Sequence, residues 1–141
     1  MKIKSYSLIM TIILSGIFSV LYSQNTDITY VEAPYKIHSY VSKSFPKSEV
    51  IQYKTKNLEH EVLFSDGVKL YFNNDLQIVK IESQCKLPDT AVQPEIVKFV
   101  QENYPEEYVR EWELNGDRQE IRLKYDKELS FNLSGELIAK E

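Results

Sequence analysis

The chain has few of the residues from which most catalytic and metal sites are built. Its 141 residues include two histidines, four glycines and one cysteine, Cys85. A single cysteine excludes an intrachain disulfide and the multi-cysteine zinc and haem patterns. His38 and His60 stand in no paired ligand spacing such as H-E-x-x-H, and the glycines are too few for a glycine-rich phosphate loop. We expect Cys85 to be a half-buried linker residue, since no histidine lies near it in sequence to activate its thiol.

Long apolar runs are also scarce, and the notable one lies at the N-terminus. Two lysines precede the uncharged stretch 8–20, and the small residue Ser23 follows it. This layout is typical of a secretory signal peptide and predicts that residues 1–23 are removed on export. An uncleaved membrane anchor is the alternative, because Leu21 is large for the third position before the cut. The run is shorter than the ~20 residues that span a bilayer, which favours cleavage.

Basic residues are in deficit once this segment is removed. Residues 24–141 retain 15 Lys and Arg against 21 Asp and Glu, a formal charge of −6. A nucleic-acid partner is therefore excluded, because phosphates require a basic face. The 118 residues of this part suit one compact domain. We expect a single periplasmic or secreted domain that does not contact the membrane after cleavage and holds no cofactor.

An internal repeat is the most informative feature of the sequence. Residues 37–82 align without a gap on residues 96–141 at a constant offset of 59. The apolar positions match throughout, for example Tyr53 with Trp112, Val62 with Ile121, Phe64 with Leu123, Leu70 with Leu129 and Phe72 with Phe131. Two copies are too few for a solenoid, so we expect the repeats, about 30–82 and 87–141, to share one sheet or core.

Each repeat begins with helical spacing and continues with the alternation of strands. Apolar residues recur at i, i+3 and i+4 after Pro34 and after Pro94, which predicts two amphipathic helices, the second capped by Asp89 or Thr90. Period-two alternation then predicts strands near 49–56, 59–65, 68–73, 76–82, 108–114, 118–124, 127–133 and 136–140. The predicted fold class is α+β: a tandem duplication of a helix followed by a four-stranded antiparallel meander, with the helices packed on one face of a shared sheet.

The alternation also separates core positions from outward positions. The expected helix-facing side chains are Tyr53, Val62, Phe64, Leu70, Phe72, Trp112, Ile121, Leu123, Leu129 and Phe131. A two-residue turn at Asp66-Gly67 would set Phe64 opposite Lys69 on the same face, which contradicts this pattern. We expect a three-residue loop or a bulge that pairs Phe64 with Leu70.

Carboxylates are the best candidates for catalysis, and their pattern favours a solvated surface. Glu102, Glu106, Glu107, Glu111 and Glu113 crowd one stretch, but they flank a turn or alternate outward on a strand. A glycosidase-like acid and base pair would need two of them in one cleft. The stretch also lacks the D-x-D-x-D-G ladder of a calcium loop, and no serine stands in a G-x-S-x-G elbow. We therefore expect a protein that is not an enzyme.

One set of motifs resembles a known family. These are Leu87-Pro88, Asn103-Tyr104-Pro105, Trp112, Glu120-Ile121-x-Leu123 and Leu129-x-Phe131-x-x-x-Gly135. They resemble the PepSY-like family of exported bacterial proteins, which is also described as similar to the beta-lactamase inhibitor protein. The first repeat shows a weaker version of the same pattern, so the resemblance covers nearly all of residues 24–141. It implies helices on one face of an antiparallel sheet, and it carries no catalytic residues.

The resemblance to an inhibitor implies that the other sheet face holds a protein partner. Outward strand positions on that face include Leu63, Tyr71, Arg122, Glu61 and Glu120, with Lys69 and Glu128 beside them. We therefore expect a non-catalytic protein-binding module, inhibitor-like in its use of the outer face. A periplasmic small-ligand-binding or sensory module is the alternative, and it would need a pocket between helices and sheet that the large core side chains leave little room for.

Overall fold

The structure is a computed structural model that describes the backbone of residues 26–140, with side chains from residue 29 onward. The predicted signal peptide, residues 1–23, lies outside the described residues. Two α-helices, α1 (Tyr35–Ser44) and α2 (Pro94–Asn103), and two short 3-10 helices, η1 (Tyr30–Glu32) and η2 (Asp89–Ala91), accompany one sheet. Its strands are β1 (Thr26–Ile28), β2 (Val50–Lys56), β3 (Glu59–Phe64), β4 (Lys69–Phe72), β5 (Ile78–Glu82), β6 (Val109–Asn115), β7 (Arg118–Leu123), β8 (Glu128–Asn132) and β9 (Leu137–Lys140).

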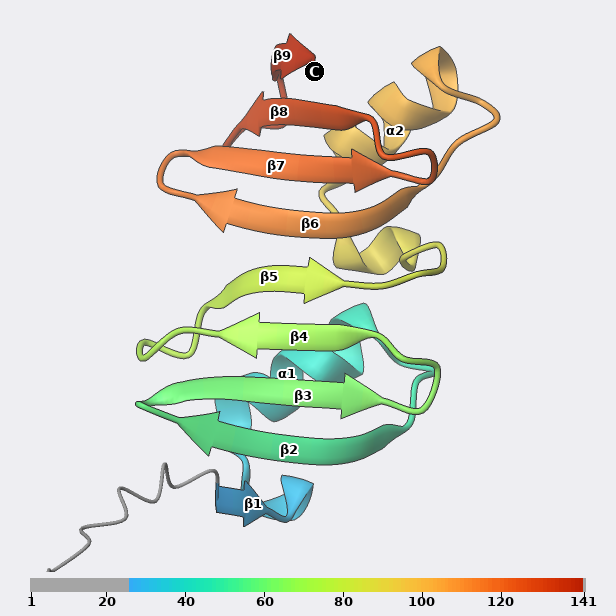
Figure 1. Cartoon of the computed structure of the whole chain (residues 1–141). Helices are drawn as coiled ribbons and strands as arrows, with labels where there is room; N and C mark the ends of the chain where they lie inside the picture. The colour runs from blue at the N-terminus through green and yellow to red at the C-terminus, as the bar shows by residue number, and fades with distance from the viewer. Residues whose placement is uncertain (1–25, 141) are drawn as a thin grey trace, which may run out of the picture.

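The described strands form a single antiparallel sheet in which spatial order follows chain order from β1 to β9. Both helices lie behind this sheet in Figure 1, with β1 and β9 at opposite ends. The eight predicted strands are present with bounds shifted by at most two residues. Strand β1 was missed because three residues are too few to show an alternation. None of the helices in the described part is long and apolar enough to cross a membrane.

The core lies between the helices and one face of the sheet. All ten side chains expected there are buried. Ile37 and Val41 of α1 belong to the same buried cluster, as do their counterparts on α2. Tyr40 meets Phe72 edge to face at 5.5 Å between ring centroids, and the equivalent rings of α2 and β8 meet at 5.4 Å. Edge-to-face packing adds to the free energy gained by burying these rings.

A polar pair sits at the same place in each half of the core. The Tyr53 hydroxyl lies 2.6 Å from His60 Nδ1. At the equivalent positions, Trp112 Nε1 donates to Gln119 Oε1 at 3.0 Å. Gln119 Nε2 in turn donates to Gln93 Oε1 and to the Asn132 carbonyl. Buried donors need partners, so Gln119 ties β6, β8 and the residue before α2 together.

Two local predictions were wrong. The β3–β4 turn has three residues between Phe64 and Val68, whose N–H and carbonyl are hydrogen-bonded, so Leu70 lies opposite Val62 and not opposite Phe64. The face of each side chain is unchanged, because both pairings keep the same parity. Asp89 and Thr90 do not cap α2: they form η2, and Gln93 precedes α2 without a side-chain cap. The Thr90 hydroxyl instead donates to the Ser44 carbonyl at the end of α1.

Strands β5 and β6 join the two halves. Lys80, Ile81 and Glu82 lie opposite Glu113, Trp112 and Glu111. The linker that follows β5 is held by the Leu87 N–H, which donates to the Val109 carbonyl. Cys85 in this linker is exposed, not half-buried as expected; its backbone N–H donates to Ser83 Oγ at 2.9 Å.

Strand β9 ends the described sheet and repeats the geometry of β5. Leu129 lies opposite Lys140 as Leu70 lies opposite Ile81, and both hairpins carry a bulge at the same place. Ile81 is fully buried because β6 covers it. Lys140 stands at the equivalent position, and its ammonium lies 5.8 Å from the Phe99 ring centroid.

Candidate functional site

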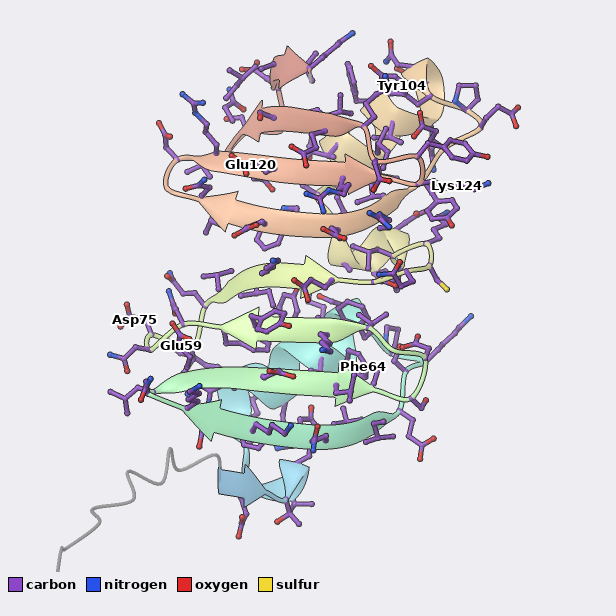
Figure 2. All side chains as sticks on the ribbon, in the orientation of Figure 1. Glu59, Phe64, Asp75, Tyr104, Glu120 and Lys124 are labelled. Atoms are coloured by element: carbon purple, nitrogen blue, oxygen red, sulfur yellow. The ribbon has the colours of Figure 1, made fainter. Side chains whose placement is uncertain are left out.

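The sheet face opposite the helices carries two continuous rows of side chains. One row runs across the strands through Lys54, Glu61, Tyr71, Lys80, Glu113, Glu120 and Ser130. The other runs through Gln52, Leu63, Lys69, Glu82, Glu111, Arg122 and Glu128. We call this surface the outer face. Since side chains alternate along a strand, all five predicted site residues lie on it. Figure 2 looks onto this face, with Glu120 on β7.

Tyr71 is held in place by a carboxylate on the next strand. Its hydroxyl donates to Glu82 Oε2 at 2.9 Å, and Lys80 Nζ lies 2.7 Å from Glu82 Oε1. Burial, followed by the hydrogen bond to Glu82, raises the pKa of Tyr71. The hydrogen bond from Lys80 is the largest cause that lowers the pKa of Glu82. The phenol therefore stays protonated and donating at neutral pH, and its ring is fixed in a half-buried position.

Arg122 is fixed in the same way on the second half of the face. Its guanidinium lies 3.1 Å from Glu111 Oε2 and 2.6 Å from Glu128 Oε1. The hydrogen bond to Glu128 is the largest cause that raises the pKa of Arg122. The pairs are half-exposed, so each contributes little to stability, but together they hold one orientation of the side chain. The apolar side chain of Leu63 is half-buried on this face. Glu61 lies directly opposite Tyr71 on the neighbouring strand.

The outer face is hollowed in two places. A hollow of about 560 Å³ in the first half is lined by Glu61 and Tyr71 among others, and one of about 310 Å³ in the second half by Glu120 and Arg122. Lys80 and Glu113 line both hollows. Four of the five predicted residues thus line one or other of these two hollows, which share Lys80 and Glu113, whereas Leu63 lines neither. We call the two hollows together the groove. The sequence did not single out Lys80, Glu82, Glu111 or Glu113 as site residues, although the same alternation places them on the outer face of β5 and β6.

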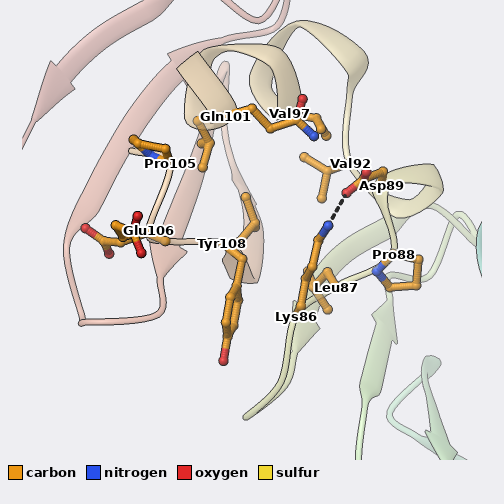
Figure 3. A pocket seen from close by; sticks show the side chains of 13 residues that line it. Lys86, Leu87, Pro88, Asp89, Val92, Val97, Gln101, Pro105, Glu106 and Tyr108 are labelled. Carbon is orange, nitrogen blue, oxygen red and sulfur yellow. Dashed lines mark ion pairs between the residues drawn. The ribbon is translucent and has the colours of Figure 1, made fainter. Parts of the chain in front are cut away.

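A third hollow, of about 360 Å³, lies on the helix side beside α2. Its floor consists of small aliphatic side chains, namely Leu87, Val92, Val97, Val100 and Val109. Figure 3 shows the Lys86–Asp89 ion pair, 3.2 Å long, on one rim, with Tyr108 and Glu106 across from it. None of the ten large core side chains lines this hollow, and all ten are buried between the helices and the sheet as expected. The hollow lies between the linker after β5, α2 and the segment 105–109.

The carboxylates that looked most chemical in the sequence are dispersed. Glu102 is exposed on α2, Glu106 and Glu107 follow α2, and Glu111 and Glu113 lie on the outer face. In the described part of the chain, no three His, Cys, Asp or Glu side chains gather as a metal site. What the structure brings together on the outer face is a polar groove lined by Tyr, Arg, Lys and Glu side chains.

A family model matches this chain over residues 14–80 and again over 59–139. Its description is putative beta-lactamase-inhibitor-like, PepSY-like. The chain belongs to this family. The PepSY-like assignment agrees with the motifs around Tyr104-Pro105, Trp112 and Phe131. No curated protein matches the chain.

Several solved structures share the fold of this PepSY-like protein. A putative calcium-regulated periplasmic protein from Bacteroides thetaiotaomicron is 24% identical, with a TM-score of 0.74 over 83% of this chain and 96% of that one. A putative periplasmic protein from Bacteroides vulgatus is 21% identical, with a TM-score of 0.73 over 85% and 98% of the two chains. A second periplasmic protein of unknown function from Bacteroides vulgatus is 22% identical, with a TM-score of 0.71 over 83% and 98%. These likenesses show the α+β fold.

Proposed function

We propose that the protein is a non-catalytic binding module that holds a protein partner on its outer face. The supporting observation is the groove: Glu61, Tyr71, Glu120 and Arg122 line two hollows that share Lys80 of β5 and Glu113 of β6. Binding surfaces gain affinity from rigid aromatic and arginine anchors in hollowed, partly desolvated positions. Tyr71 and Arg122 are such side chains, and their carboxylate partners fix them before any partner arrives, which lowers the entropy cost of association.

We also propose that the two halves arose by duplication, with both helices covering one face of the shared sheet. Helices α1 and α2 begin and end 59 residues apart, and the bulges in β2–β3 and β4–β5 recur 59 residues later. Asn73 Oδ1 accepts two backbone N–H groups of its turn, and Asn132 Oδ1 does the same. The two family-model matches end at residues 80 and 139, again 59 apart.

Export is part of the proposal. The signal-peptide pattern of residues 1–23 and the periplasmic descriptions of the similar structures both support a periplasmic or secreted location. One of those proteins is described as calcium-regulated. Among the described residues of this chain, no three His, Cys, Asp or Glu side chains gather in a way that could hold a metal ion, so the calcium description is not carried over.

A small-ligand role is the second candidate, and the hollow beside α2 favours it. Its volume of about 360 Å³ lies within the range of small-molecule sites, and its floor is aliphatic with a few polar groups on the rim. A ligand there would contact Val97 and Tyr108 and leave the outer face free. Binding that is lost on Val97→Asp but retained on Arg122→Ala would favour this role.

The main test is quantitative binding to a protein recovered by cross-linking in the native compartment. Tyr71→Ala and Arg122→Ala should each cost more than ~1 kcal/mol, about a fivefold loss of affinity. Tyr35→Ala is the matched control, because Tyr35 is an 83% exposed tyrosine on α1, behind the sheet. Unchanged affinity in both outer-face variants, with melting temperatures near that of the wild type, would contradict the proposal.

A further inference from the structure

The two repeats share their fold but differ in charge. Residues 30–82 contain seven acidic and seven basic side chains, whereas residues 87–141 contain 13 acidic and seven basic ones. The first repeat is therefore neutral and the second carries a formal charge of −6. Since both repeats build the same core and turns, the fold does not require this difference.

Part of the excess charge lies on the outer face, at a cross-strand pair. Glu113 and Glu120 stand directly opposite each other on β6 and β7. The equivalent positions in the first repeat are Lys54 and Glu61, also directly opposite each other on β2 and β3. Opposite charges at such positions stabilise a sheet and like charges destabilise it. The second repeat thus carries a like-charge pair where the first shows that a favourable pair fits.

Nearby cations neutralise this pair only in part. Lys80 lies opposite Glu113 and forms a long ion pair with it at 4.0 Å, but it lies closer to Glu82, at 2.7 Å. Arg122 is engaged by Glu111 and Glu128. Among the described side chains, the Glu120 carboxylate accepts one hydrogen bond, from Asn115 Nδ2 at 3.4 Å. Both carboxylates line the hollow of about 310 Å³ in the second half of the outer face. Lys80, Arg118 and Arg122 line the same hollow, so a group that enters it meets both carboxylates beside cations that are already paired with other carboxylates.

We propose that the second half of the outer face docks a basic protein surface, with an arginine of the partner received by Glu113 and Glu120. This inference rests on the proposed outer-face function and names the partner chemistry and the half that receives it. Directly opposite residues have Cβ atoms about 5 Å apart, so a guanidinium with its five N–H donors can reach the carboxylates of both Glu113 and Glu120. The net charge of the second repeat adds long-range attraction for a basic partner, which raises the association rate.

The test uses two synthetic peptides and the ¹⁵N-labelled exported protein. One peptide, acetyl-Gly-Arg-Thr-Arg-Thr-Arg-Gly-amide, places its arginines on one side of an extended chain, and the other carries glutamate in their place. We expect the arginine peptide to shift backbone amides of residues 111–113 and 118–122, with an affinity that falls as salt is added. Equal shifts on β2 and β3, equal effects of both peptides, or no shift with the arginine peptide would each overturn the inference. So would the same shifts with calcium chloride alone, since the acceptor would then be a metal site.

Variants separate a docking role from a structural one. Glu113→Lys places a lysine opposite Glu120 on one side and Lys80 on the other, so the melting temperature should stay near that of the wild type while the arginine peptide binds at least tenfold more weakly. Glu32→Lys makes the same change of net charge on η1 and should leave the peptide affinity within twofold. Unchanged affinity in Glu113→Lys would overturn the inference. The proposed function of the outer face would still stand or fall separately, because it is tested by the affinity of Tyr71→Ala and Arg122→Ala for the native partner.

Discussion

Gln119 offers the sharpest test of how the core is held together. Its side chain accepts from Trp112 Nε1 at 3.0 Å and donates to Gln93 Oε1 at 2.7 Å and to the Asn132 carbonyl at 3.0 Å. Gln119→Leu keeps the approximate volume but removes all three bonds. At ~0.5–1.5 kcal/mol per bond, with the buried indole N–H left without a partner, we expect a loss of about 2–4 kcal/mol. That is a large share of the ~5–15 kcal/mol of a typical domain.

Urea denaturation gives the free energy of unfolding, and an unchanged m-value would show that the unfolded reference is the same. A double-mutant cycle isolates the indole bond: in a Trp112→Phe background, Gln119→Leu should cost about 1 kcal/mol less, because no donor is left unpaired. Equal costs in both backgrounds would refute the role of the Trp112 bond. A total cost within ~0.5 kcal/mol would refute the whole network.

Three further predictions concern a histidine, a turn and a core ring. Burial lowers the pKa of His60, so the contribution of His60 to stability is complete above the unfolded pKa of 6.5 and is lost as pH falls through the lower folded pKa. His60→Gln should therefore flatten the pH dependence of the melting temperature below about 6.5. An unaltered pH profile would contradict this. Leu58 has a φ of 67°, a left-handed conformation that is strained for any residue with a Cβ, and its side chain is 68% exposed. Leu58→Gly should therefore be ~0.5–1 kcal/mol more stable than Leu58→Ala in urea denaturation. Equal stabilities would contradict the strain at this position. Phe131 is fully buried against Phe99, so Phe131→Ala should cost ~3–5 kcal/mol in the same assay, and a loss below ~1 kcal/mol would place the ring outside the core.

The sequence predicted the strands well because each one alternates over at least four residues and ends at a turn residue. The same alternation separated Tyr71 and Arg122 from Phe72 and Ile121, so the outer face could be named before its geometry was known. What it could not predict is which strand edges meet between the repeats. The pairing of β5 with β6 places Glu82 beside Glu111 and aligns Lys80 with Glu113, and these contacts depend on a register between residues about 30 positions apart. The groove at this junction was therefore missed.

The end of the sheet has a consequence for how copies of this protein meet. Strand β9 presents the edge that β5 uses to receive β6, so the architecture has no geometric reason to stop after two units. At that edge Lys140 stands in the position of the buried Ile81, on the helix side of the sheet. A further strand added there would bury its charge, which makes the addition costly. The neighbouring Ile138 is 49% exposed, and one such side chain does not make the edge of β9 apolar. Addition of a further strand at β9 would therefore bring an ammonium group to the position that Ile81 fills with apolar surface where β5 meets β6.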